Sequence, residues 1–338
     1  MFELVGIIAG IIAAASVVLF GSRGLMDLIR GASRRRNSQP TQSLAQPVER
    51  QPVGGAELGL TQEIRYCVAA DGVRLAHATS GQGYPVVKLP HWFTHLEFEW
   101  TSPVLRQWCT ELTKNYQLIR YDQRGCGLSD WEVSDFSHSA RLGDLGTVTN
   151  ALGLDRFALN GISQSAAVAI SYVVEHPEEV SHLILSGGTA QGWALRGQAV
   201  EEEWEAFLTL IGHGWGRTDP AYRRLFTNKF MPDGTEEQIR WFDELQRVAT
   251  SGDNAVNTAR AFGTADVSAL LPQLRVPTLV LHSKGDVIVP FEAGRRLATD
   301  IPGAHFVPLD SKNHLLIESE PAWRTCIQEI QRFLAGAA

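Results

Sequence analysis

Three residues of the types needed for nucleophilic catalysis follow one another along the chain: Ser163, Asp286 and His314. A serine hydroxyl is a poor nucleophile until an imidazole accepts its proton, and the imidazole needs a carboxylate to fix its tautomer and stabilise its cation. Each of the three residues follows an apolar run with the length of a buried strand. We therefore predict that Ser163 is a nucleophile, that His314 is its base and that Asp286 orients His314.

Ser163 lies in the most informative segment, residues 157–170. An apolar run ends in Gly-Ile-Ser-Gln-Ser and passes directly into an alanine-rich segment that favours a helix. Strand, sharp turn and helix are the context of a nucleophile elbow, in which the serine Oγ is exposed above the sheet edge. The backbone N–H of Gln164 then lies at a helix N-terminus and is predicted to stabilise an oxyanion. Ser165 replaces the last glycine of Gly-x-Ser-x-Gly, and its small side chain is a mild replacement.

Each of these residues also has a structural alternative. The serine could be a buried structural residue, the aspartate could form local hydrogen bonds in a turn, and the histidine could be one of ten in the chain that lies on a surface loop. The order Ser, Asp, His, with each residue just past a predicted strand, favours the catalytic interpretation.

Further segments give the resemblance to a known family. Residues 85–93 are similar to the strand and His-Gly-x oxyanion segment of the α/β-hydrolase superfamily, and residues 121–130 match its Asp-x-Arg-Gly-x-Gly-x-Ser loop. Residues 285–290 resemble its acid-bearing Gly-Asp-x-Ile-Val-Pro turn, and the whole resemblance covers residues 61–334. Residues 65–131 resemble, more narrowly, a bacterial subgroup that also occurs fused to nucleotide cyclases or transcriptional regulators.

The resemblance implies that the backbone N–H of Phe93 pairs with that of Gln164 to form an oxyanion hole. Trp92 departs from the pattern, because it stands where the family has the glycine of His-Gly-x. Bulky residues resist positive φ, so this turn is predicted to differ from the family's or to adopt an ordinary backbone conformation. We expect His91 to tether the loop through side-chain hydrogen bonds.

The chain order of the three residues is that of α/β-hydrolases. It predicts a serine hydrolase that cleaves a small-molecule carboxylic ester or lactone through an acyl-enzyme, with no metal or organic cofactor. A serine nucleophile argues against epoxide hydrolases and haloalkane dehalogenases, while peptidases, thioesterases and carbon–carbon bond hydrolases stay open. The alternative from another class is a membrane-tethered sensor that binds a small ligand in a hydrolase-fold pocket with little turnover.

Alternating apolar runs and helical segments predict an α/β-hydrolase fold, with a mostly parallel sheet and helices on both faces. The opening hairpin is predicted at Ala70-Asp71-Gly72. Strands are predicted at residues 64–69, 73–79, 86–89, 117–121, 157–161, 182–186, 278–282 and 305–308, and a final helix at residues 322–334.

The alternation lapses between residues 188 and 276. We predict a helical cap at residues 190–266, between a first part of the hydrolase core at 61–189 and a second part at 267–338. Nine aromatic residues mark this segment: Trp193, Trp204, Phe207, Trp215, Phe226, Phe230, Trp241, Phe242 and Phe262. Most are expected to form the cap's own core, and a few to line an apolar acyl or alcohol pocket.

The chain has 338 residues, is 44% hydrophobic and carries a net charge of −7. Residues 1–50 hold six Arg and three Asp or Glu, so the remainder carries −10. An acidic globular part of this kind is not expected to bind nucleic acid. The four cysteines show no zinc-type spacing and no disulfide framework. The sequence gives no indication of the oligomeric state.

An apolar run of 17 residues extends from Leu4 to Phe20. As a helix it would span about 25 Å at ~1.5 Å per residue, near the lower limit for a membrane span. Glu3 precedes the run and five arginines follow it, which favours an N-terminal anchor at residues 1–22 over a cleaved signal peptide. With a basic juxtamembrane segment and flexible linker at residues 23–60, we predict membrane anchoring by one N-terminal helix and a cytoplasmic catalytic domain.

Overall fold

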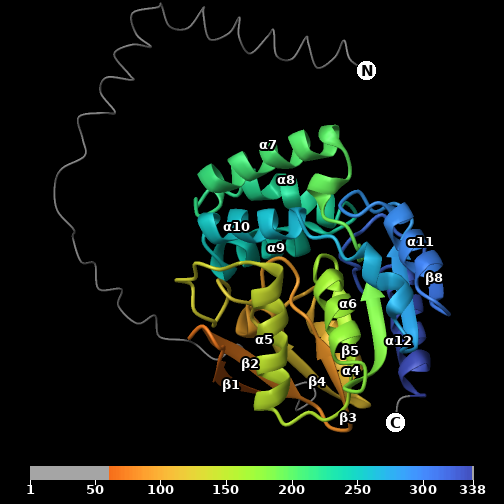
Figure 1. Ribbon diagram of the computed structural model, residues 1–338. Helices are drawn as coiled ribbons and strands as arrows, with labels where there is room; N and C mark the ends of the chain where they lie inside the picture. Colours follow the sequence, from red (N-terminus) through yellow and green to blue (C-terminus); the bar gives the residue numbers. More distant parts are fainter. Residues whose placement is uncertain (1–60, 337–338) are drawn as a thin grey trace, which may run out of the picture. The chain divides into compact units, whose positions relative to one another are not determined.

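The computed structural model of the protein describes residues 61–336, which form one eight-stranded sheet flanked by helices (Figure 1). The strands are β1 (Gln62–Val68), β2 (Arg74–Ser80), β3 (Tyr84–Lys88), β4 (Tyr116–Tyr121), β5 (Phe157–Ile162), β6 (Val180–Ser186), β7 (Thr278–Ser283) and β8 (His305–Leu309). Their order across the sheet is β1-β2-β4-β3-β5-β6-β7-β8. Strand β2 pairs antiparallel with β1 and with β4, and every other pair is parallel. The predicted mostly parallel sheet is confirmed.

The opening hairpin forms where Asp-Gly predicted it. Gly72 has φ +89°, a conformation that side chains with a Cβ rarely adopt, and the N–H of Ala69 donates to the carbonyl of Val73 at 2.8 Å. The two strands then pair in register from Gln62 with Ser80 to Val68 with Arg74. A local turn preference therefore determines how the sheet begins.

Helices cover both faces of the sheet. They are α3 (Leu96–Trp100), α4 (Arg106–Thr113), α5 (His138–Ala151), α6 (Ser165–Glu175), α11 (Phe291–Asp300) and α12 (Pro321–Leu334). Buried side chains of α5, α6 and α11 share one hydrophobic cluster with the sheet, and those of α4 and α12 share another. The expected stripe of α12 packs in the second cluster: Trp323, Ile327, Ile330 and Leu334 are all buried. Burying apolar side chains on both faces is the main stabilising contribution to this layered arrangement.

Four further helices lie between β6 and β7, preceded by the short 3₁₀ helix η1 (Trp193–Leu195) and followed by η2 (Ser268–Gln273). They are α7 (Gln198–Gly214), α8 (Ala221–Phe230), α9 (Glu236–Ala249) and α10 (Gly252–Gly263), and we call them the helical insertion. Figure 1 shows them as a layer of their own beside the sheet (green to teal). Their buried side chains share a third cluster with Trp92, Phe93, Ile288 and Val289, so the helical insertion packs on the loops that follow β3 and β7.

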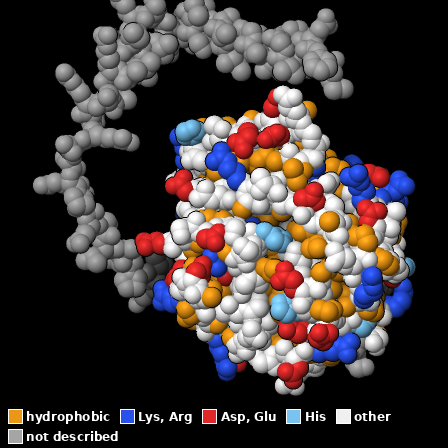
Figure 2. All heavy atoms as spheres, in the orientation of Figure 1, with side chains coloured by type: hydrophobic (Ala, Val, Ile, Leu, Met, Phe, Trp, Pro, Cys, Tyr) orange, Lys and Arg blue, Asp and Glu red, His pale blue; other side chains and the backbone are white. Residues whose placement is uncertain are grey.

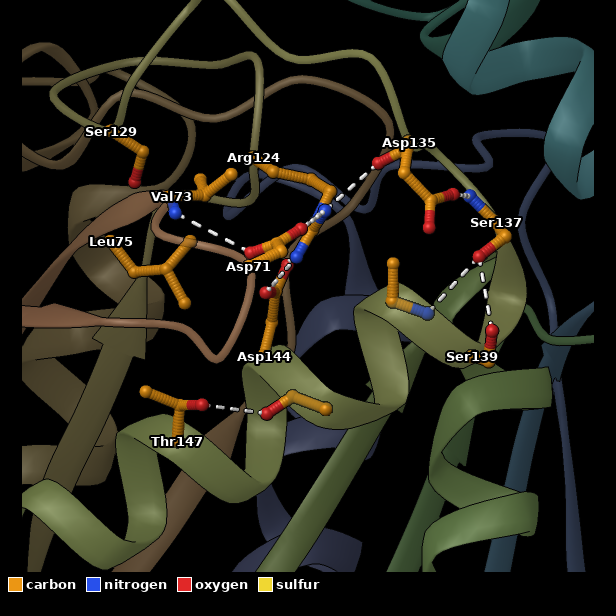
Figure 3. Close-up of polar contacts among 12 residues, drawn as sticks. Asp71, Val73, Leu75, Arg124, Ser129, Asp135, Ser137, Ser139, Asp144 and Thr147 are labelled. Carbon is orange, nitrogen blue, oxygen red and sulfur yellow. Dashed lines mark hydrogen bonds and ion pairs between the residues drawn. The ribbon is translucent and has the colours of Figure 1, made fainter.

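The loop after β4 is held by a buried cation. Arg124 donates two hydrogen bonds to Asp144 at 2.8 and 2.6 Å, one to Asp71 at 2.7 Å and one to the carbonyl of Asp135 at 2.9 Å (Figure 3). Planar, bidentate pairing of this kind is strong and directional. It joins the hairpin turn, the loop after β4 and α5, which explains why an arginine stands in the Asp-x-Arg-Gly motif.

The predicted location of the protein is wrong. Within residues 61–336, no helix is long and apolar enough to cross a membrane. The predicted anchor at residues 1–22 and the linker at residues 23–60 lie outside the described residues.

The surface in Figure 2 carries charges of both signs. Lys and Arg side chains are interspersed with Asp and Glu on this face of the described part. The face therefore carries no continuous basic stripe, the feature with which proteins bind a phosphate backbone.

Candidate active site

Ser163 occupies a strained turn between β5 and α6. It is the only non-glycine residue among residues 61–336 with positive φ, at +55°. Its N–H donates to the carbonyl of Ser186 on the neighbouring strand β6 at 2.9 Å. A strained residue of this type persists only where its surroundings hold it, and such residues cluster at functional sites.

Close packing of α6 on the sheet supports this turn. A Cβ on Gly161 would lie 2.8 Å from Cβ of Ala169, and one on Gly188 would lie 2.5 Å from Cβ of Ala166. Ser165, which replaces the motif's last glycine, accepts from the N–H of Ile162 at 2.9 Å and donates to its carbonyl at 2.8 Å. The replacement therefore closes the turn with a side chain instead of loosening it.

The structure brings the three predicted residues into one hydrogen-bonded chain. His314 Nε2 lies 2.9 Å from Ser163 Oγ, and His314 Nδ1 lies 2.6 Å from Asp286 Oδ2. Both distances are within the range for direct hydrogen bonds. This arrangement can pass the serine proton to an imidazole whose far side is held by a carboxylate.

Asp286 is 7% exposed and is held in place by its own turn. Its Oδ1 accepts from the backbone N–H groups of Ile288 at 2.8 Å and Val289 at 3.0 Å, which leaves Oδ2 for His314. Burial raises the pKa of Asp286, but the charge and N–H of His314 and the Val289 amide lower it more, so its pKa lies below the usual value. The carboxylate is therefore available as an anion at neutral pH.

His282 was not among the predicted site residues, although it interrupts an apolar strand. It is fully buried on β7, where Nε2 lies 2.8 Å from the carbonyl of Val289 and 3.7 Å from Asp286 Oδ2. Burial lowers its pKa. We interpret it as a neutral residue that fixes the Asp286 turn, and a polar residue within the run 278–283 was the available sequence signal.

The loop after β3 differs from the family pattern, as the sequence indicated. No positive φ occurs at Trp92, so its backbone adopts an ordinary conformation. Gln123 Nε2 donates to the carbonyl of His91 at 3.3 Å and forms a further short hydrogen bond with the carbonyl of Trp92. Because C=O and N–H of a trans peptide point in opposite directions, this contact directs the N–H of Phe93 away from Gln123. Neither that N–H nor that of Gln164 forms a backbone hydrogen bond within residues 61–336.

His91 is the residue that we expected to tether this loop. Its Nε2 lies 3.4 Å from Oε1 of Glu99, and Oε2 of Glu99 lies 3.2 Å from Nη1 of Arg120. The contact is longer than an ordinary hydrogen bond. Burial lowers the pKa of His91, and we assign it no part in the chemistry.

Trp92 is the centre of an aromatic cluster. Its ring lies 5.6–6.4 Å from those of five neighbours, namely Phe93, Trp204, Trp215, Phe226 and Phe230. Its Nε1–H donates to the carbonyl of Ala255 on α10 at 3.0 Å. The bulky replacement for glycine therefore attaches the loop after β3 to the helical insertion.

The helical insertion also contacts His314 directly. The carbonyl of Phe230, at the end of α8, accepts from the N–H groups of His314 at 2.9 Å and Leu315 at 3.1 Å. The ring of Phe230 meets the imidazole edge to face at 5.3 Å. The position of the predicted base thus depends on the helical insertion.

A pocket of about 40 Å³ contains Ser163. Of the nine aromatic residues named from the sequence, Trp193, Trp204, Phe230 and Phe262 line it, together with Trp92. The polar lining consists of Ser163, Gln164, Thr189 and Arg196. Arg196 was not predicted, and no motif or spacing marked it.

The fold is that of an α/β-hydrolase. The sequence pattern of the family described as "Serine aminopeptidase, S33" matches residues 99–318, well over half of the chain. The chain therefore belongs to this family and, with it, to the α/β-hydrolase superfamily, as the resemblance indicated.

Curated relatives agree with this assignment. "AB hydrolase superfamily protein YisY" of Bacillus subtilis (strain 168) is 28% identical over 266 residues, which cover 74% of this chain and 91% of the relative. The "2-hydroxy-6-oxononadienedioate/2-hydroxy-6-oxononatrienedioate hydrolase" of Paraburkholderia phymatum is 30% identical over 204 residues, 56% of this chain and 67% of the relative. The esterase EaEST from Exiguobacterium antarcticum, a solved structure, has a TM-score of 0.69 and 23% identity over 80% of this chain and 98% of its own. At that identity it shows the fold alone.

The family and these curated relatives support a hydrolase, and the sensor alternative finds no support among them. Membrane tethering likewise finds none.

Proposed function

We propose that the protein is a carboxylic ester hydrolase that cleaves a small ester or lactone through an acyl-enzyme. The observation that carries the proposal is the continuous hydrogen-bonded chain from Ser163 through His314 to Asp286, in which the nucleophile occupies the positive-φ turn. A serine whose proton is accepted by an oriented imidazole is the arrangement that acyl transfer requires.

In the first half-reaction, His314 Nε2 accepts the Ser163 proton while Oγ attacks the substrate carbonyl carbon. The backbone N–H groups of Gln164 and Phe93 stabilise the negative charge on the former carbonyl oxygen. His314 then donates the proton to the leaving alcohol oxygen as its bond to the acyl carbon breaks. Asp286 stays ionised and stabilises the imidazolium.

In the second half-reaction, water loses a proton to His314 and attacks the acyl-enzyme. The tetrahedral intermediate collapses, Ser163 Oγ regains the proton and the carboxylic acid leaves. In a lactone the alcohol stays attached to the acyl group, and the product is a hydroxy acid.

The helical insertion supports a further part of this proposal. We propose that residues 190–266 form a cap on a core made of residues 61–189 and 267–338. In support, three aromatic side chains of the helical insertion, Trp204, Phe230 and Phe262, line the Ser163 pocket, and the carbonyl of Phe230 accepts hydrogen bonds from the backbone N–H groups of His314 and Leu315. The small pocket favours substrates of modest size.

Cleavage of a carbon–carbon bond is the second candidate. It is favoured by one observation, the 30% identity with the Paraburkholderia phymatum hydrolase, whose name refers to a dioate substrate. The two candidate functions can be distinguished by comparing the turnover of a vinylogous 1,5-diketone with that of a simple ester of the same length. A carbon–carbon bond hydrolase would turn over the diketone faster.

Labelling with a fluorophosphonate tests the nucleophile. The protein should react covalently and Ser163→Ala should not, while ester turnover in the variant should fall by at least about 10³-fold. Unchanged labelling of Ser163→Ala would contradict the assignment.

A further inference from the structure

Arg196 brings a charge into an otherwise neutral pocket. Among the described residues that line the Ser163 pocket, it is the only one with a charged side chain. It directly follows η1, just before the helical insertion begins, and it is half-buried. Charged groups are costly to bury unless they have a partner, so the partners of Arg196 decide whether it is structural.

The partners of Arg196 within the described residues are weak. Its guanidinium donates to the carbonyl of Ile288 at 3.3 Å and to that of Gln191 at 3.3 and 3.4 Å, and it forms no ion pair with a carboxylate there. Arg223, a structural arginine of the helical insertion, donates to three backbone carbonyls at 2.6–2.8 Å. The N–H···O range in proteins is about 2.7–3.2 Å, so the hydrogen bonds of Arg196 are slightly longer than this range. Because the guanidinium carries five N–H groups, some of these donors stay available to bind a ligand.

A second residue that lines the same pocket, Gln164, carries a side-chain donor. The Nε2 atom of Gln164 is buried and has no hydrogen-bond partner within residues 61–336. An unpaired buried amide costs free energy. The pocket therefore offers an amide and a guanidinium, and no carboxylate residue lines it.

Arg196 also lies where the pocket meets a larger cavity. A neighbouring cavity of about 280 Å³ shares Thr189 and Arg196 with the Ser163 pocket. Burial lowers the pKa of Arg196, and the charge of Asp286 opposes this effect. An anion bound at the junction would favour the charged guanidinium in the same way.

We propose that the substrate carries a carboxylate, remote from the bond that is cleaved, which binds Arg196 and the side-chain amide of Gln164. The substrate class is then a half-ester of a dicarboxylic acid, an ester of a hydroxy acid or a carboxylate-bearing lactone. Guanidinium and carboxylate pair through two parallel hydrogen bonds, so Arg196 would select the anion and fix its orientation. This inference rests on the proposed function.

Two pairs of esters test the proposal, because the carboxylate could lie on either side of the cleaved bond. The first pair is monomethyl adipate and methyl hexanoate, which differ at the end of the acyl chain. The second pair is 6-acetoxyhexanoate and hexyl acetate, which differ at the end of the alcohol chain. In each pair the first ester has a carboxylate where the second has a methyl group. The measured quantity is the ratio of kcat/KM for the charged ester to kcat/KM for the neutral one. We expect the full-length protein to favour the charged ester in at least one pair, chiefly through a lower KM.

In Arg196→Gln that ratio should fall about 10- to 100-fold, the effect of losing hydrogen bonds to a charged group, and Arg196→Lys should restore part of it. Arg296→Gln is the matched control, since Arg296 lies on the larger cavity, is exposed and does not line the Ser163 pocket. The control should keep the ratio within about twofold of wild type.

The outcomes separate this inference from the proposed function. Equal kcat/KM for both members of each pair, in a protein that hydrolyses them and reacts with fluorophosphonate, would overturn the carboxylate site alone. A ratio that is unchanged in Arg196→Gln would also overturn it, because a purely structural arginine would affect both esters alike. Absence of labelling and of all turnover would overturn the proposed function itself.

Discussion

The nucleophile turn and the loop after β3 both contribute to the candidate site, but they are built in different ways. The nucleophile turn, residues 161–165, contains the strained φ of Ser163. It is held by nearby residues, through the close approach of α6 at Gly161 and the two hydrogen bonds of Ser165, and by one hydrogen bond from the N–H of Ser163 to Ser186 on β6. The loop after β3, residues 90–93, has no strained residue, and its contacts come from distant parts of the chain, Gln123 and the helical insertion.

The difference shows which departures from a motif are tolerated. At the nucleophile turn, the replacement of glycine by Ser165 is compensated within three residues. At the loop after β3, the replacement of glycine by Trp92 is compensated by an aromatic cluster with members more than 100 residues away in sequence. A mismatch to a motif can thus be accommodated by contacts from a distant segment of the chain.

The largest expected effect concerns Ser163→Gly. Loss of the hydroxyl should lower kcat by about 10⁶-fold, while the free energy of unfolding should stay equal or rise by up to about 1 kcal/mol, since glycine adopts positive φ without strain. Turnover and urea denaturation measure the two quantities. Ser134→Ala, at an exposed position, is the control. A clear loss of stability would show that Ser163 is not strained in the folded protein.

Trp92→Ala should have the opposite effect on stability. Removing a 4% exposed tryptophan from the cluster should lower the free energy of unfolding by about 3–5 kcal/mol. Trp131→Ala, at a 39% exposed position, should cost far less. Denaturant titration of both variants checks the contrast. Similar losses in the two variants would mean that Trp92 does not join the loop to the helical insertion.

Gln123→Met tests whether a distant side chain orients the N–H of Phe93. Methionine keeps the volume but cannot donate to the carbonyls of His91 and Trp92. We expect kcat to fall about tenfold, less than the 10²–10³-fold effect of deleting an oxyanion donor, with KM changed less.

Gln246→Met is the matched control for this prediction, because Gln246 is a fully buried glutamine of the helical insertion that bonds Thr227 and the carbonyl of Phe242. It should lose stability without losing kcat. Equal kcat in Gln123→Met and wild type would contradict the prediction, because it would show that Gln123 is not needed to orient the N–H of Phe93.

The smallest effect is a pH dependence of stability from Asp286. Because its pKa is lower in the folded protein than in the unfolded chain, the ionised form stabilises the fold. That contribution is fully present above the unfolded-state pKa of about 3.9 and is lost as the pH falls through the folded-state value. The stability difference between wild type and Asp286→Asn should therefore be larger near about pH 6 than near about pH 3. A difference that grows on acidification would contradict the lowered pKa.

Features that depend on neighbouring residues could be predicted from the sequence. Turn chemistry at Gly72, apolar runs of strand length and the Gly-Ile-Ser-Gln-Ser segment each act over a few residues, so the sheet, the hairpin and the approximate places of Ser163, Asp286 and His314 could be predicted. The helical spacing of the apolar residues in 322–334 was sufficient to predict α12 for the same reason.

Features that join distant segments could not be predicted from the sequence and became visible in the three-dimensional structure. The role of Trp92, the contact of Phe230 with His314 and the four aromatic residues that line the pocket depend on how the helical insertion packs on the sheet. Arg196 is a further example, since whether an arginine is paired or free to bind a ligand depends on carbonyls and cavities supplied by other segments. Side-chain packing of this kind is set by three-dimensional fit, which no local pattern of residues encodes.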